Sequence, residues 1–113
     1  MTDIKFLKKE NVFVGFVCSG HTGYDEYGKD ILCATLSGIT QSVVLGLKDV
    51  CGIDIKVNRN DNDGYIKVEL PKTIDKVKLD KAQVLLNTLY LSIEDLKQGY
   101  SKYISMEVIE YVY

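Results

Sequence analysis

The stretch that decides the fold is residues 30–50, DILCATLSGITQSVVLGLKDV. Its apolar residues recur every three or four positions, at Leu32, Leu36, Ile39, Val43, Leu47 and Val50. This spacing places them on one side of an α-helix and predicts an amphipathic helix over the stretch. Such a helix must bury its apolar side, so the flanking segments have to supply a partner surface.

Segments on both sides of this helix alternate apolar and polar residues instead. Residues 3–7 and 12–18 precede it, are separated by four polar residues, and predict a β-hairpin. A second hairpin is predicted after the helix, from residues 53–57 and 66–70 around a turn at 60–64.

The rest of the chain predicts one more helix and one more strand. Residues 79–96 return to helical spacing, and Gly99 is suited to end that helix. Residues 104–113 form a last strand, apolar on both faces over part of its length, which predicts a central or doubly covered place in the sheet. The order ββα-ββα-β predicts an α+β fold, a two-layer sandwich with two helices on one face of a mostly antiparallel sheet.

Length, charge and cysteine count limit the classes of function that the chain can have. A chain of 113 residues, 46% hydrophobic and 27% charged, predicts a single domain over residues 1–113. The net charge of −2 gives no basic excess, so direct nucleic-acid binding is not expected. Apolar stretches look too short to cross a membrane, and residues 1–6 lack a signal-peptide core, which predicts a cytoplasmic protein without membrane contact. The odd number of cysteines, three, predicts free thiols in a reducing compartment.

The candidate chemistry lies in residues 20–33, GHTGYDEYGKDILC, which join the only histidine, His21, to Cys33. An imidazole can take the proton of a thiol and later give it to a leaving group. If Asp30 caps the helix, Cys33 falls in the first turn, where free backbone N–H groups favour the thiolate. The segment thus predicts a Cys-His active site, although a cysteine or a histidine taken alone is more often a buried inert thiol or a hydrogen-bonded loop side chain.

Neighbouring residues have two possible roles each. Asp30 either caps the helix, the favoured role, or orients His21, and Ser37 either hydrogen-bonds the thiol or substrate or is a small packing residue. Residues 22–29 predict either a solvated connection or a mobile, acidic substrate loop suited to a basic peptide. With the glycine before His21, the predicted substrate loop comprises Gly20, Gly23, Tyr24, Asp25, Glu26, Tyr27 and Gly28.

A metal site is the main competitor. Cys18, His21, Cys33 and Cys51 make a Cys₃His zinc set on paper, but at about 1.5 Å per residue the last two lie roughly 27 Å apart along one helix. A site using the first three with water is a weaker alternative. The acidic turn 61–64 does not match a calcium loop, because Arg59 falls at a ligand position. No metal or cofactor is expected.

Two glycines, Gly38 and Gly46, stand inside the first helix, where each costs up to about 1 kcal/mol relative to alanine. They predict close packing, either within the domain or against a second copy of the chain.

Taken together, Gly20-His21, the acidic loop, the run Asp30-Ile31-Leu32-Cys33-Ala34 and Ser37 resemble the ribosomal-processing cysteine proteases called Prp. The resemblance also covers the length and the element order. It implies that Cys33 attacks the scissile carbonyl, that His21 is its base and acid, and that Asp30 and Ser37 support the pair. Thr22 and Thr35 stand where members commonly carry alanine, a departure that bears on pocket shape and substrate preference.

The resemblance further implies a substrate and an assembly. The substrate would be the aromatic-rich N-terminal extension of large-subunit ribosomal protein twenty-seven, and the enzyme would be a homodimer. Two other functions remain open: a non-catalytic ribosome-associated peptide-binding protein, and a thiol-redox or zinc protein. Catalysis requires His21 and peptide binding alone does not, so a His21 variant distinguishes a protease from a peptide-binding protein. Metal analysis of the purified protein tests the thiol-redox or zinc alternative.

Overall fold

The computed structural model describes residues 1–20, 27–62 and 64–111, with side chains left aside at 27–30. Their elements follow the predicted order ββα-ββα-β. The elements are β1 (Thr2–Lys9), β2 (Val12–Ser19), α1 (Tyr27–Leu45), a π-helical turn η1 (Gly46–Val50), β3 (Lys56–Asn60), β4 (Tyr65–Glu69), α2 (Lys76–Gly99) and β5 (Ile104–Glu110).

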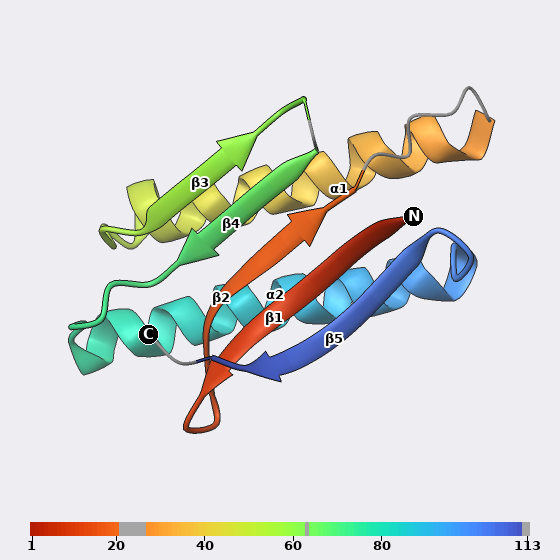
Figure 1. Cartoon of the computed structure of the whole chain (residues 1–113). Helices are drawn as coiled ribbons and strands as arrows, with labels where there is room; N and C mark the ends of the chain where they lie inside the picture. Colours follow the sequence, from red (N-terminus) through yellow and green to blue (C-terminus); the bar gives the residue numbers. More distant parts are fainter. Residues whose placement is uncertain (21–26, 63, 112–113) are drawn as a thin grey trace.

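The five strands form one sheet in the order β3-β4-β2-β1-β5, and both helices cover the same face of it (Figure 1). All neighbouring strands are antiparallel except β1 and β5, which run parallel with Thr2 beside Ile104. The predicted two-layer α+β sandwich with a mostly antiparallel sheet is therefore confirmed.

The expectation of a central place for the last strand is wrong, because β5 lies at the edge of the sheet and pairs only with β1. Its apolar residues fall on both faces without both faces being covered. Ile104 is buried under the helices, whereas Val108, two pairs further along the same face, is 42% exposed. The apolar pattern thus reflects one buried end of an edge strand.

The core lies between the helices and the sheet. Phe6 and Phe16 from the sheet are fully buried and meet Leu32 and Leu47 from the first helical segment and Leu86 from α2. The sequence analysis expected no stretch long and apolar enough to cross a membrane. The helical residues Ile31–Val50, 20 in number, are long and apolar enough by length and composition alone. A helix that supplies a soluble core passes the same test.

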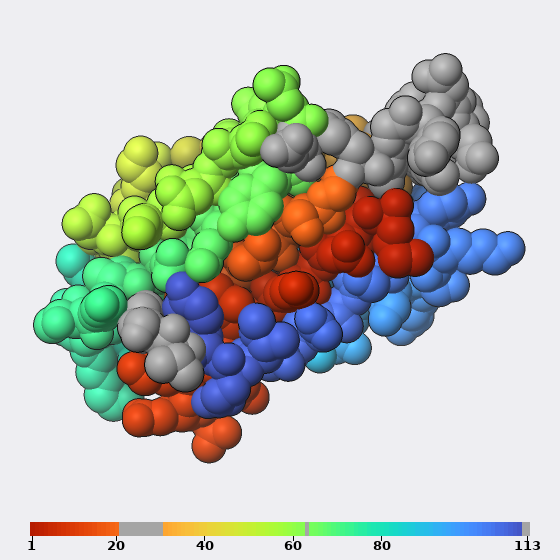
Figure 2. All heavy atoms as spheres, in the orientation of Figure 1, coloured from red at the N-terminus to blue at the C-terminus, as the bar shows by residue number. Residues whose placement is uncertain are grey.

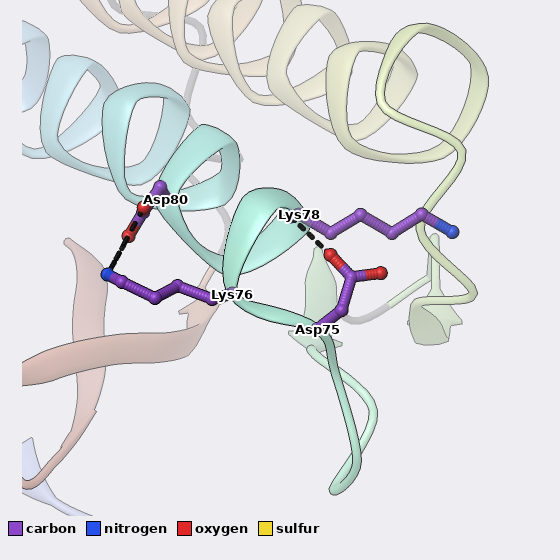
Figure 3. A network of polar contacts seen from close by, with 4 residues as sticks. All are labelled: Asp75, Lys76, Lys78 and Asp80. Atoms are coloured by element: carbon purple, nitrogen blue, oxygen red, sulfur yellow. Dashed lines mark hydrogen bonds and ion pairs between the residues drawn. The ribbon is translucent and has the colours of Figure 1, made fainter.

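The two helices begin differently. Asp75 caps α2, and its Oδ1 accepts a hydrogen bond from the backbone N–H of Lys78 at 2.9 Å (Figure 3). The expectation that Asp30 caps the first helix is wrong, because α1 already begins at Tyr27. At the other end of this helical segment, a Cβ on Gly46 would lie 3.0 Å from Leu85 of α2, so this glycine serves packing within the domain.

Neither α1 nor α2 covers the other face of the sheet, which faces the viewer in Figures 1 and 2. One aromatic residue after β5 reaches across it: the hydroxyl of Tyr111 donates to Glu69 of β4, and Lys67 lies 5.0 Å from the centre of its ring. Leu7 of β1 is nevertheless buried on this face. The Tyr111 contacts therefore tie the chain after β5 to the strand three places away.

Candidate active site

One side of α1 forms the wall of a pocket of about 530 Å³. The helix contributes residues spaced three and four apart, which share one side of a helix: Cys33, Leu36, Ser37, Thr40 and Gln41. At 1.5 Å per residue, this wall runs about 12 Å from the cysteine to the glutamine. Cys33 therefore stands at one end of an elongated hollow.

The opposite wall is built from strand ends that the sheet register gathers together. The start of β1 pairs with the end of β2, with Asp3 beside Ser19, and Cys18 of β2 pairs with Ile66 at the start of β4. As a result, chain segments far apart in sequence meet at this edge. They contribute Thr2, Ile4, Cys18, Gly20, Arg59, Asp61, Gly64, Tyr65 and Ile66.

Gly20 occupies a position that only glycine fits. Its φ is +109°, a backbone conformation that residues with a side chain rarely adopt. A Cβ at this position would lie 2.4 Å from the carbonyl oxygen of Met1. The chain thus leaves β2 through a tight bend directly before His21. His21 itself lies outside the described residues, as do Gly23, Tyr24, Asp25 and Glu26 of the predicted substrate loop.

The start of α1 changes the predicted surroundings of Cys33. Because the helix begins at Tyr27, Cys33 is its seventh residue and lies beyond the first turn, where free N–H groups and the helix dipole act most strongly. Tyr27 and Gly28 likewise belong to the helix and not to the loop, which corrects that part of the prediction. Asp30 is the fourth helical residue, which suits no capping role.

Cys33 and Ser37 are brought together as predicted, one turn apart on the pocket wall. Cys33 is partly exposed and is not in a disulfide, and Ser37 is exposed. Both residues therefore line the hollow.

Cys18 lines the same pocket but differs chemically. Burial raises the pKa of its thiol from the ordinary 9.0 to about 12, an effect that the side chain of Thr40 partly offsets. Among the described residues the buried Thr40 hydroxyl nonetheless has no partner in full hydrogen-bond geometry, so we regard the two groups as neighbours in weak contact. Cys18 remains a protonated thiol at neutral pH and is unsuited to nucleophilic attack.

Sequence reasoning missed the far end of the pocket. Arg59 of β3 donates from Nη2 to Oε1 of Gln41 at 3.0 Å, and Tyr65 lies beside them in the lining. Continuing the helical spacing from Cys33 by seven and eight residues would have found Thr40 and Gln41. No local signal predicts Arg59 or Tyr65, because their place depends on strand pairing.

Metal ligands do not gather in the part of the chain that the structure describes, which holds no group of three or more His, Cys, Asp or Glu side chains. The three-ligand zinc alternative includes His21 and so falls partly outside these residues. Cys33 and Cys51 lie near opposite ends of the first helical segment, consistent with their sequence separation.

The comparison with protein families decides how this pocket is interpreted. Residues 1–105 match the family model described as cysteine protease Prp.

The chain belongs to the Prp family of cysteine proteases.

Two named relatives agree with this membership. The ribosomal processing cysteine protease Prp of Bacillus subtilis is 25% identical over 87 residues, covering 77% of this chain and 78% of its own. The Staphylococcus aureus protein of the same name is 27% identical over 100 residues, 88% of this chain and 91% of its own.

Two crystal structures share the fold. SMU.848 from Streptococcus mutans superposes with a TM-score of 0.87 at 23% identity, over 98% of this chain and 96% of its own. The S. aureus Prp in complex with a substrate peptide gives 0.83 at 21% identity, over 96% and 100%. The Prp family is one of cysteine proteases, so the chain is an enzyme of the peptide-bond hydrolase class.

Proposed function

We propose that this Prp-family chain removes the N-terminal extension of large-subunit ribosomal protein twenty-seven, with Cys33 as nucleophile and His21 as its base. The observation that carries the proposal is the placement of Cys33. Its thiol is partly exposed, is not in a disulfide and lines a pocket large enough for peptide side chains, while the other thiol in that pocket, Cys18, is held protonated.

In the proposed mechanism, His21 accepts the thiol proton as Sγ of Cys33 attacks the scissile carbonyl carbon. The tetrahedral intermediate collapses when the C–N bond breaks, and the imidazolium gives its proton to the leaving amine. Water then adds to the thioester with His21 as base, which releases the new carboxyl terminus and regenerates the thiol. Asp30 and Ser37 have supporting roles in this proposal.

The pocket suits a peptide with apolar side chains. Ile4, Leu36 and Ile66 supply apolar walls, and Tyr65 supplies an aromatic one. Burial of an aromatic side chain against such walls contributes binding energy in proportion to the area removed from water. This lining supports an aromatic-rich cleavage sequence, and the S. aureus relative crystallised with a substrate peptide supports peptide binding at this fold.

Two further parts of the proposal concern the protein's setting. We propose that the enzyme works in the cytoplasm, where free thiols persist, and as a homodimer. The three cysteines, none of which is in a disulfide, support the first part.

The test is mass spectrometry of peptides that include an extended ribosomal N-terminus, incubated with wild type, Cys33→Ala and His21→Ala. Wild type is expected to cleave at one bond, and Cys33→Ala and His21→Ala are expected not to cleave. The control Cys51→Ala, altered at a thiol outside the pocket, should cleave like wild type. Cleavage that survives in both Cys33→Ala and His21→Ala would exclude the dyad. Tight binding without cleavage by folded, reduced wild type would favour a peptide-binding role.

A further inference from the structure

The only arginine of the chain, Arg59, lines the end of the pocket that is far from Cys33. It lies on β3, and its Nη2 donates to Oε1 of Gln41 at 3.0 Å. Gln41 stands on α1 eight residues after Cys33, about 12 Å further along the helix. The amide oxygen of Gln41 orients the guanidinium but carries no charge. Among the described residues no ion pair includes Arg59, so no carboxylate in that part of the chain neutralises it.

A buried hydroxyl lines the same end of the pocket. Thr40 precedes Gln41 on α1 and is only 5% exposed. In the described part of the chain its Oγ1 has no partner in full hydrogen-bond geometry, whereas the hydroxyl of Thr35 on the same helix donates to the carbonyl of Ile31. A buried hydroxyl without a partner is unfavourable, so a substrate group that supplies one gains binding energy.

The sheet places the arginine and the hydroxyl on two sides of one apolar residue. Ile66 of β4 pairs with Arg59 of β3 on one side and with Cys18 of β2 on the other. Thr40 contacts Cys18, and Gln41 holds Arg59. Neighbouring strands are about 4.8 Å apart, so a substrate group above Ile66 lies between the two polar side chains.

The group that fits between them is an acceptor of hydrogen bonds. A guanidinium only donates, and a hydroxyl can donate as well. The oxygen of a carboxylate or of a carboxamide accepts from both, whereas an ammonium group only donates and an alkyl chain does neither. Asp61, in the turn after β3, also lines the pocket, and its charge reduces the advantage of a carboxylate over a carboxamide.

The distance from the thiol determines which substrate residue reaches this place. An extended peptide advances about 3.3 Å per residue, so 12 Å corresponds to about three or four residues. We propose that Arg59, positioned by Gln41, acts with the Thr40 hydroxyl to select a substrate side chain with an acceptor oxygen, about three or four residues from the scissile bond. This inference rests on the proposed nucleophile, because the distance is counted from Cys33.

The experiment is cleavage of a pool of random decapeptides, which assumes no ribosomal sequence, with mass spectrometry to locate each cut. At one position three or four residues from the cut, wild type is expected to favour Glu, Gln, Asp and Asn over Leu and Lys by about tenfold, the effect of one hydrogen bond to a charged donor. Arg59→Leu should lose this preference. Lys56→Leu removes a positive charge from the same exposed strand outside the pocket and should keep it in full.

Two further variants keep the test decisive. Arg59→Lys retains the charge without the planar fork and should reduce the preference, which gives a result if Arg59→Leu does not fold. Thr40→Val removes the hydroxyl and should reduce the preference several-fold without lowering the melting temperature measured by circular dichroism, because the hydroxyl has no partner to lose. A lower melting temperature would show that Thr40 has a structural role.

The outcomes separate this inference from the proposed function. Cleavage by wild type without such a preference, or a preference that the Arg59 variants leave unchanged, would overturn the inference and leave the protease intact. A preference of the expected kind without cleavage of the extended ribosomal N-terminus would overturn only the proposed substrate. No cleavage of any peptide by folded, reduced wild type would overturn both.

Discussion

At the scale of single residues, the pocket holds two thiols in different environments. Cys33 stands on an exposed helix wall, whereas Cys18 lies on a strand under α1, where burial raises its pKa to about 12. Only a thiolate attacks carbon quickly, so burial restricts nucleophilic chemistry in this pocket to the helix residue.

This contrast predicts the order of chemical labelling. With limiting iodoacetamide at neutral pH, Cys18 should react after both Cys33 and Cys51, because the Cys18 thiolate is scarce below pH 10. Peptide mapping by mass spectrometry measures the order. Labelling of Cys18 ahead of Cys33 in the folded protein would contradict both the environment and the proposed nucleophile.

Gly20 gives a second prediction at this scale. Gly20→Ala should destabilise the protein by about 2 kcal/mol or more, because the new methyl group meets the Met1 carbonyl and the backbone has φ of +109°. Gly38→Ala is the matched control: its methyl group meets nothing within 4 Å, and helix propensity favours alanine by up to about 1 kcal/mol. Urea unfolding compares the two, and equal effects would show that the bend at Gly20 is not strained.

The sequence predicted contacts between pocket residues that are close in sequence better than contacts between residues that are distant in sequence. Cys33 and Ser37 share a helix wall because their spacing is four, which can be read directly. Arg59 and Tyr65 reach the same pocket only because β3 and β4 pair beside β2. Residue types alone carry no information on that pairing.

Among the elements, both helices were predicted, but the sequence indicated where α2 begins better than where α1 begins. Asp75 is a capping residue type and does cap α2, whereas Asp30 is the same type and lies inside α1. The helix extends back over Gly28, a residue with poor helix propensity, so propensity did not mark its beginning. The position of Cys33 in the helix was therefore misjudged by one turn.

The α2 cap can be tested directly. Asp75→Ala should lower the free energy of unfolding by about 1 kcal/mol, because it removes the acceptor for the Lys78 N–H. Asp80→Ala breaks only the exposed Lys76–Asp80 pair, 3.3 Å long, and should change stability by less than about 0.5 kcal/mol (Figure 3). Chemical denaturation of both variants gives the comparison, and a larger effect of Asp80→Ala would contradict the assigned cap.

At the scale of the whole molecule, the fold class was readable and the strand order was not. Alternation predicts strands and the hairpins predict two pairings, but nothing local joins β2 to β4 or β1 to β5. The β2–β4 pairing forms the site, since it brings the start of β4 beside the end of β2 and the start of β1. For the same reason, the sequence did not predict that β5 lies at the edge of the sheet.

Three groups among the described residues link the free energy of unfolding to alkaline pH. The pKa values of Cys18, Lys67 and Tyr90 are all raised: by burial for the thiol, by the hydrogen bond to Tyr111 for the lysine, and by burial and Glu94 for the tyrosine. Each group keeps its proton to higher pH in the folded state than in the unfolded state. The stability that these three groups contribute should therefore be fully present below pH 9 and decrease as the pH rises towards 12.

Urea unfolding at pH 8, 9, 10 and 11 measures this decline. Cys18→Ala removes one of the three groups and should flatten the curve by up to about 1.4 kcal/mol per pH unit above pH 9. Curves that stay parallel for wild type and Cys18→Ala would show that the Cys18 thiol titrates alike in both states.

The pairing of the first strand with the last has a consequence for how the protein is made. β1 is synthesised first among these strands, but its neighbour β5 comes more than ninety residues later, at Ile104–Glu110. Until then one edge of β1 has no partner, and the sheet cannot be completed before β5 has been synthesised. An enzyme of this architecture therefore cannot complete its sheet on the first four strands alone, which delays protease activity until β5 has left the ribosome.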